Sequence, residues 1–131
     1  MKDMMMEVYD QLIANDLIKE KVTKERIKFY EVPESLDTSK PFIVIDTPLG
    51  PPTSAYYAAN KEMSQIFSYQ INVETTNRKL TDELSKEIKK IMWKNDFKQL
   101  SGGLDAYFTE TKRFVQARRY RKNTKMHDTD Y

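Results

Sequence analysis

The stretch FSYQINVETTNRKLTDELSKEIKKIM (residues 67–92) decides the fold, because it holds the two clearest periodicities in the chain. In its first part apolar side chains alternate with polar ones, and the apolar positions are Phe67, Tyr69, Ile71 and Val73. This alternation is typical of a strand with one face on the core. It predicts an antiparallel or edge-type strand at residues 67–74.

The second part of the same stretch has the spacing of a helix. Apolar residues recur every three or four positions, at Leu80, Leu84, Ile88, Ile91 and Met92. Acidic side chains lie in the first turns and lysines in the last, which suits the helix dipole. We therefore expect a helix at about residues 80–93 with one buried face. Asn77 or a preceding threonine can cap its start.

The first half of the chain adds one helix and two strands. Apolar residues at helical spacing predict a helix from about residue 3 to 15, and they are Met4, Met5, Val8, Tyr9, Leu12 and Ile13. Residues 27–32 alternate like a short strand that Pro33 ends. The continuous apolar run PFIVID (residues 41–46) is typical of a central strand covered on both faces.

Residues 47–64 are the one long irregular segment. Pro48, Pro51 and Pro52 surround Gly50, and this pattern predicts an ordered loop or an arm, not a helix or a ladder strand. The segment carries Leu49, Tyr56 and Tyr57, which we interpret as candidate protein contacts. The alternative is that the two tyrosines fold back onto the body.

The C-terminal part predicts two short strands. Gly102 and Gly103 turn the chain, and strands follow at about residues 105–110 and 113–121. Residues 123–131 have no apolar period and are expected to form a flexible tail. The chain is thus predicted to be one α+β domain over residues 1–122, with a mostly antiparallel sheet and two main helices packed on one face.

Charge is distributed unevenly along the chain. Residues 112–131 have a net charge of +5, whereas the other 111 residues have a net charge of −3. A mildly acidic body with a basic end can bind a copy of itself, an acidic neighbour or nucleic acid. The candidate contacts in this basic strand are Arg118, Arg119, Tyr120, Arg121 and Lys122. A charged edge strand that resists aggregation is the alternative.

The residues give no candidate for catalysis. There is no cysteine, and the one histidine, His127, lies in the expected tail. Asp46 and Asp105 could form a metal pair only if the fold joined them, which the sequence does not predict. We therefore expect no enzymatic activity, no metal and no cofactor. The sequence also lacks a signal peptide pattern and a run of transmembrane length, which predicts a protein made in the cytoplasm.

Five segments, read together, resemble a known family. They are IKFYEVPES, PFIVIDTPLGPP, YQINVET, LTDELSKEIKKIMW and DAYFTETKRFVQARRYR, and they cover most of residues 26–122. In this order they are similar to the tail-terminator (tail-completion) proteins of long-tailed phages of Gram-positive bacteria.

The resemblance implies a tail-terminator-like α+β fold and a structural role. Copies would form a hexameric ring that caps the tail tube at the head–tail junction of the virion. The partners would be the tail tube protein and a head–tail connector protein, with DNA passing through the ring. A connector or stopper protein is the alternative within phage assembly, and a small DNA-binding protein is the alternative from another class.

Overall fold

The computed structural model describes residues 3–47, 53–58 and 61–123, with the backbone alone for residues 53–58 and 61–65. The helices in these ranges are α1 (Met4–Ile13), α2 (Asp16–Lys21) and α3 (Arg78–Lys94), with a 3-10 helix, η1, at Lys24–Arg26. The strands are β1 (Ile27–Phe29), β2 (Phe42–Asp46), β3 (Thr53–Ala58), β4 (Lys61–Thr75), β5 (Lys98–Gln99), β6 (Leu104–Phe108) and β7 (Arg113–Asn123).

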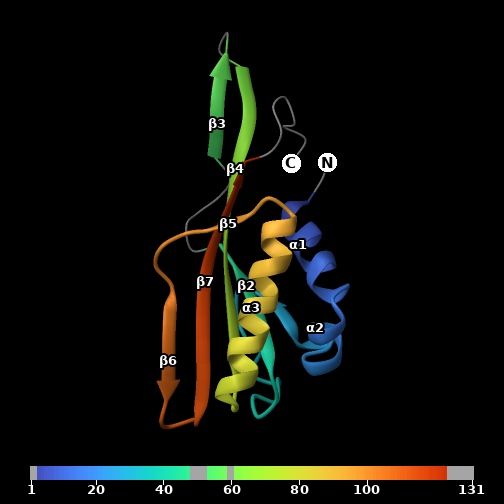
Figure 1. The fold of residues 1–131 in the computed structure, drawn as a ribbon, viewed down its shortest axis with the longest axis vertical. Helices are drawn as coiled ribbons and strands as arrows, with labels where there is room; N and C mark the ends of the chain where they lie inside the picture. Colours follow the sequence, from blue (N-terminus) through green and yellow to red (C-terminus); the bar gives the residue numbers. More distant parts are fainter. Residues whose placement is uncertain (1–2, 48–52, 59–60, 124–131) are drawn as a thin grey trace.

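The seven described strands form one mostly antiparallel sheet with β4 and β7 at its centre. Its order is β1-β2-β4-β7-β5, with β3 paired to β4 and β6 paired to β7. The pair β1–β2 is parallel, and all the others are antiparallel. One edge of β4 therefore carries β2 and β3 end to end, and the far edge of β7 carries β5 and β6 in the same way (Figure 1).

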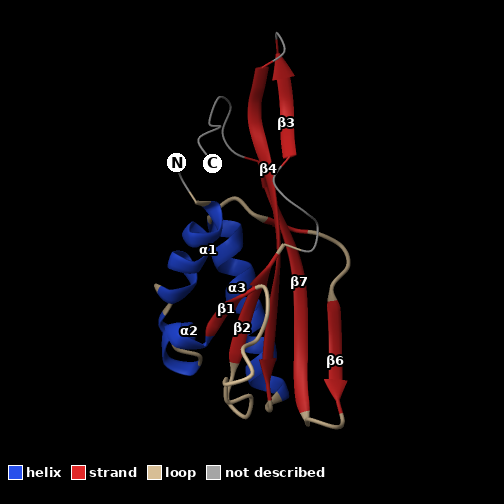
Figure 2. Cartoon of the chain, turned by 180° about the vertical axis from the view of Figure 1, so that it is seen from behind, coloured by secondary structure: helices blue, strands red, loops and turns tan. Residues whose placement is uncertain are grey.

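The three helices cover one face of this sheet, as the views from the two sides show (Figures 1 and 2). The core lies between the helices and the apolar row of β4, whose members Phe67, Tyr69, Ile71 and Val73 are all buried. The α+β prediction and the inward row of residues 67–74 are thus confirmed. The opposite side of the sheet, which carries no helix, is called the open face below.

The join between β4 and α3 follows the sequence prediction. Asn77 is the N-cap of α3, and its side chain accepts a hydrogen bond from the backbone N–H of Leu80 at 3.1 Å. The predicted apolar row faces the core, because Leu84, Ile88, Ile91 and Met92 are buried and Leu80 packs against them. Satisfying an N–H at the helix start stabilises the helix by about 1 kcal/mol.

Two predictions in the first half need correction. The first helix ends at Ile13, and a second helix, α2, starts after Asn15, whose side chain caps the N–H of Ile18 at 3.1 Å. The strand expected at residues 27–32 ends at Phe29 instead. Tyr30 has a φ of 69°, which turns the chain out of the extended region before Pro33 is reached.

The long irregular segment is largely a β-hairpin. Residues 53–58 form β3 and pair with residues 61–66 of β4, so the expectation of a loop over residues 47–64 is wrong for its second part. The partner strand β4 is 15 residues long, about twice its predicted length. The hairpin projects beyond the rest of the sheet (Figure 1). We call residues 53–58 and 61–65 the arm.

The two C-terminal strands occur as predicted, with shifted ends. Residues 104–108 and 113–117 pair through a tight turn at residues 109–112. Gly103 is required where β6 begins, since its φ is 108° and an added Cβ would lie 2.2 Å from the carbonyl oxygen of Ala117. The chain thus passes close to β7 as it enters the edge strand.

Candidate assembly interface

The basic strand β7 divides its side chains between the two faces of the sheet. Cross-strand pairing places Arg119 opposite Gln70 and Arg121 opposite Ser68, on the open face. Arg118 pairs with Ile71, on the face that carries the helices. Alternating direction along a strand explains the division. The basic residues therefore do not form one continuous patch.

Several of these guanidinium groups already have partners within the chain. Arg118 donates to the carboxylate of Asp105 on β6 at 2.5 Å, and Arg119 Nε donates to Gln70 Oε1 at 3.0 Å. Arg113 lies 3.6 Å from the carboxylate of Glu74 and 5.6 Å above the ring of Phe42. Burial raises the pKa of Glu74, and attraction to Arg113 opposes that shift.

Tyr120 is removed from the candidate contacts. Its side chain is 1% exposed and lies in the core, where β7 places it opposite Tyr69 of β4. Its hydroxyl is buried without a hydrogen-bond partner among the described residues. Burial raises the pKa of Tyr120 to about 12. The residue stabilises the fold from inside the core, where another chain cannot reach it.

Lys122 and Arg121 lie at the end of β7 nearest the arm. Lys122 Nζ is 5.5 Å from the ring centroid of Phe97, a cation–π contact. Arg121 is exposed and pairs with Lys98 of β5. Of the five candidates on the basic strand, Arg121 is therefore the one with an exposed side chain, and Lys122 is half-buried.

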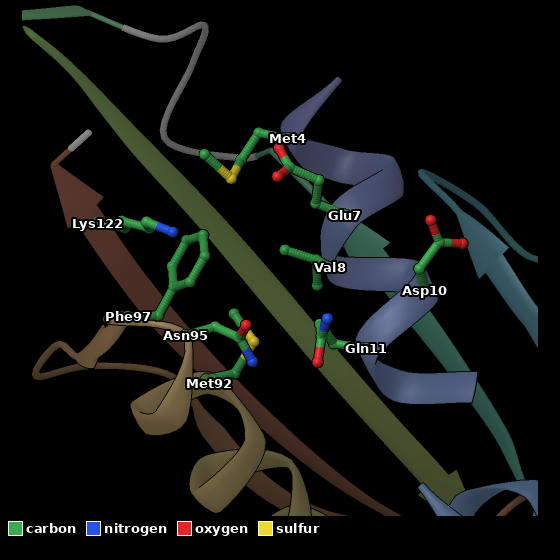
Figure 3. Close-up of a pocket in the computed structure, with 9 residues that line it drawn as sticks. All are labelled: Met4, Glu7, Val8, Asp10, Gln11, Met92, Asn95, Phe97 and Lys122. Atoms are coloured by element: carbon green, nitrogen blue, oxygen red, sulfur yellow. The ribbon is translucent and has the colours of Figure 1, made fainter. Parts of the chain in front are cut away.

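Lys122 also lines a small pocket between α1 and the end of α3 (Figure 3). The pocket has a volume of about 140 Å³ and is lined by Met4, Glu7, Val8, Asp10, Gln11, Met92, Asn95, Phe97 and Lys122. Apolar side chains form one part of the lining, with carboxylates and amides beside them. A volume of this order is about that of one benzene-sized ring.

The candidates of the irregular segment are placed only in part. Leu49 lies outside the described residues. Tyr56 and Tyr57 belong to β3, and their backbones pair with Ser64 and Glu62. The pairing shifts register on both sides of Tyr56, which indicates a bulge in this strand. The backbones of these two tyrosines thus lie in the arm.

The edge strand β6 is a surface that the sequence interpretation missed. Leu104, Tyr107 and Phe108 are 49%, 48% and 46% exposed, although all three are large apolar or aromatic residues. The ring of Tyr107 packs at a tilt against that of Phe114, with the ring centroids 4.6 Å apart, and Phe108 borders a concave region at the β6–β7 turn. The apolar residues of DAYF indicated a strand, but nothing in the sequence showed that this strand would lie at the edge of the sheet.

The two aspartates considered as a metal pair lie apart. Asp46 pairs with Gln70 on the open face, whereas Asp105 pairs with Gln116 on the other face and binds Arg118. Across the described residues, no group of three or more His, Cys, Asp or Glu side chains could hold a metal ion. The same part of the chain has no helix both long enough and apolar enough to cross a membrane.

No protein-family model matches the sequence, and the search of curated proteins finds no match. The functional interpretation therefore depends on the residues themselves and on the resemblance of their segments.

Proposed function

We propose that this chain is a structural subunit of phage assembly, a tail terminator without enzymatic activity. Its copies form a hexameric ring that caps the tail tube and joins it to the head. The partners are other copies, the tail tube protein and the head–tail connector protein, and DNA passes through the ring. The site of action is the head–tail junction of the virion, after assembly in the host cytoplasm. The resemblance over residues 26–122 supports this proposal.

The arm is the observation that carries the proposal. Within the described residues, β7 pairs with β4 only from Ile66 onward, so residues 61–65 pair with β3 alone. An isolated two-stranded hairpin is at best marginally stable in water, and it needs a third strand or a packed layer. A projecting hairpin of this length therefore favours completion by another chain. In a closed ring, the neighbouring subunit supplies that contact, and each patch meets a different patch.

The test is an arm-shortened variant, in which residues 54–65 are replaced by an Asn-Gly turn that joins Thr53 to Ile66. These two residues are direct cross-strand partners, so a two-residue turn closes the shortened hairpin. We expect the variant to keep its fold and melting temperature but to lose ring formation and the capping of unfinished tail tubes in electron micrographs. A matched control reverses two exposed charges on α3, Lys89→Glu and Lys90→Glu.

If the arm-shortened variant caps tail tubes as well as the wild type does, the proposal is wrong. Connector and stopper proteins form the alternative within phage assembly, and the same micrographs separate them. A terminator binds tail tubes without heads, whereas a connector or stopper binds DNA-filled heads without tails.

The DNA-binding alternative is disfavoured by the partners of the basic strand. Arg113, Arg118 and Arg119 each contact a side chain of their own subunit, and the strand divides its charges between two faces. The triple variant Arg118→Glu, Arg119→Glu and Arg121→Glu tests this point. A DNA-binding protein would lose affinity steeply as salt is raised, and the variant would abolish that binding. We expect the wild type to show no such salt-dependent binding.

A further inference from the structure

The outer strand β6 has one paired side and one side without a described neighbour. It pairs with β7 over residues 104–108 without a register shift. No other described element lies beyond it in either view of the fold (Figures 1 and 2). A strand in this position presents a row of unpaired N–H and C=O groups, which is a template for another strand.

This edge lacks several of the devices that prevent strand pairing. Edge strands are commonly protected by lysine, by proline or by a bulge. Residues 104–108 contain none of these, and their one charged side chain, Asp105, is bound to Arg118. The edge strand β3 of the arm differs, because its register shifts around Tyr56. The edge strand of the arm is thus irregular, whereas β6 pairs without a register shift and carries three half-exposed apolar or aromatic side chains.

The side chains of β6 are arranged symmetrically about Ala106. Cross-strand pairing with β7 places Leu104, Ala106 and Phe108 on the open face, and Asp105 and Tyr107 on the other face. Leu104 and Phe108 lie on one face, each two residues from Ala106. Asp105 and Tyr107 lie on the other face, each one residue from Ala106. A strand with such a pattern is complementary to a reversed copy of itself.

We propose that β6 pairs antiparallel with β6 of a second copy of this chain, about a two-fold axis through Ala106. Leu104 then lies opposite Phe108 of the second copy, and the two Ala106 residues lie opposite each other. On the other face, Asp105 lies opposite Tyr107 of the second copy, whose hydroxyl can donate to the carboxylate. The two sheets become one continuous sheet, with the exposed apolar side chains of β6 packed in cross-strand pairs.

Charge and apolar pairing together select this register over the two neighbouring ones. A shift by two residues in one direction places Asp105 opposite Asp105, and like charges directly opposite are destabilising. A shift by two in the other direction places Leu104 opposite Glu110 and loses an apolar pair. The register centred on Ala106 avoids both faults. The sequence of residues 104–108 is therefore complementary to the same residues of a second copy.

The contact has a role separate from the ring. A two-fold contact uses the same patch on both copies, whereas a ring contact joins two different patches. The β6 pair is therefore a dimer of free subunits, which keeps the apolar edge from aggregation. Because five residues per copy bury little area, the dimer is weak and concentration-dependent. The inference does not depend on the proposed tail function, and either one can fail alone.

Disulfide trapping tests the register directly, since the chain has no cysteine of its own. Ala106→Cys places two thiols directly opposite, at a Cβ separation of about 4.5–5.5 Å that small movements can close. Leu104→Cys is the matched control, because its two copies would be offset by about 13 Å along the strands. We expect rapid disulfide dimers from Ala106→Cys and few from Leu104→Cys. The double variant Leu104→Cys/Phe108→Cys should again form them rapidly.

Charge patterns give a second measurement in the Ala106→Cys background. In the variant Leu104→Lys/Phe108→Lys, the proposed dimer places a lysine opposite a lysine at two positions. In Leu104→Lys/Phe108→Glu it places a lysine opposite a glutamate at the same two positions. Both replaced side chains are about half exposed, so the monomer fold should tolerate either variant. We expect the Lys/Glu variant to cross-link about tenfold faster than the Lys/Lys variant, from two cross-strand pairs changed in sign.

Four results would overturn the proposal. One is cross-linking of Leu104→Cys as fast as that of Ala106→Cys, and another is equal rates for the two charge patterns. A third is a wild type that sediments as a monomer at every soluble concentration. The last is loss of the dimer in the arm-shortened variant, which would assign the β6 edge to the arm of a neighbouring copy.

Discussion

Thr75 and Thr81 are buried with their hydroxyl oxygens 2.8 Å apart, at the point where β4 ends and α3 begins. Both hydroxyl oxygens also lie within hydrogen-bond distance of the backbone carbonyl of Asn77, at 2.7 and 2.9 Å. The backbone N–H of Asn77 in turn donates to the Thr75 hydroxyl at 2.9 Å. This network fixes the angle at which the main helix leaves the main strand.

Replacing Thr75 by valine should therefore destabilise the fold. Valine keeps the shape but removes the acceptor for the Asn77 N–H and the partner of the buried Thr81 hydroxyl, and a buried polar group left without a partner costs about 1–3 kcal/mol. Urea denaturation measures the free energy of unfolding. The matched control is Thr76→Val at the next, exposed position. Equal stability of the two variants would show that the network contributes nothing.

Replacing Leu84 by alanine should destabilise the fold more strongly. Leu84 lies on the buried face of α3 and is 0% exposed. Removing a fully buried leucine side chain costs about 2–5 kcal/mol through lost transfer energy and the cavity left behind. The control is Glu83→Ala, an exposed neighbour on the same helix. A loss below about 0.5 kcal/mol, which is typical of surface changes, would mean that the helix is not packed as described.

Replacing Tyr120 by phenylalanine should leave stability unchanged or raise it by about 1 kcal/mol. The reason is that the buried Tyr120 hydroxyl has no described hydrogen-bond partner, so its removal relieves a desolvation cost. Thermal unfolding of wild type and variant at one pH measures the effect. A fall in melting temperature of several degrees would indicate that the hydroxyl makes a stabilising hydrogen bond.

Glu74 should make stability depend on pH in an unusual direction for a carboxylate. Its pKa in the folded state is raised above 4.5 by burial, partly offset by Arg113. The folded state therefore holds the proton more tightly than the unfolded chain, and stability decreases as pH rises from about 4.5 through the folded pKa.

Glu74→Gln should remove this dependence, so the free energy of unfolding of the variant minus that of the wild type should increase over the same pH range. Denaturation of both proteins between about pH 4 and pH 7 measures the difference. The opposite slope would mean that the ion pair with Arg113 outweighs burial.

The sequence predicts the body of this fold well, because local patterns control it. The alternation at residues 67–74 and the helical spacing after Asn77 each bury one face, and tertiary packing agrees with both. The helix α2 was missed because six residues are too short to show a period. The β-hairpin of the arm was missed because the prolines before it suggest irregular structure, and TSAYYA has no alternation of apolar and polar residues.

The candidate site was predicted less completely, because it depends on register between distant segments. Tyr120 stands among basic residues in the sequence, yet β7 places it opposite Tyr69 in the core. Arg118 and Asp105 are 13 residues apart, and only the β6–β7 hairpin brings them into contact. Which strand lies at an edge is likewise a property of the whole sheet, so β6 gave no local signal of exposure.

The unbroken course of β4 gives the arm a mechanical connection to the core. The strand runs from Lys61 to Thr75, a length of about 50 Å at the usual rise per residue. Its outer end pairs with β3, and its inner end is held by β2, β7 and the Thr75–Thr81 network. A displacement of the arm is therefore transmitted along one continuous strand to the start of α3.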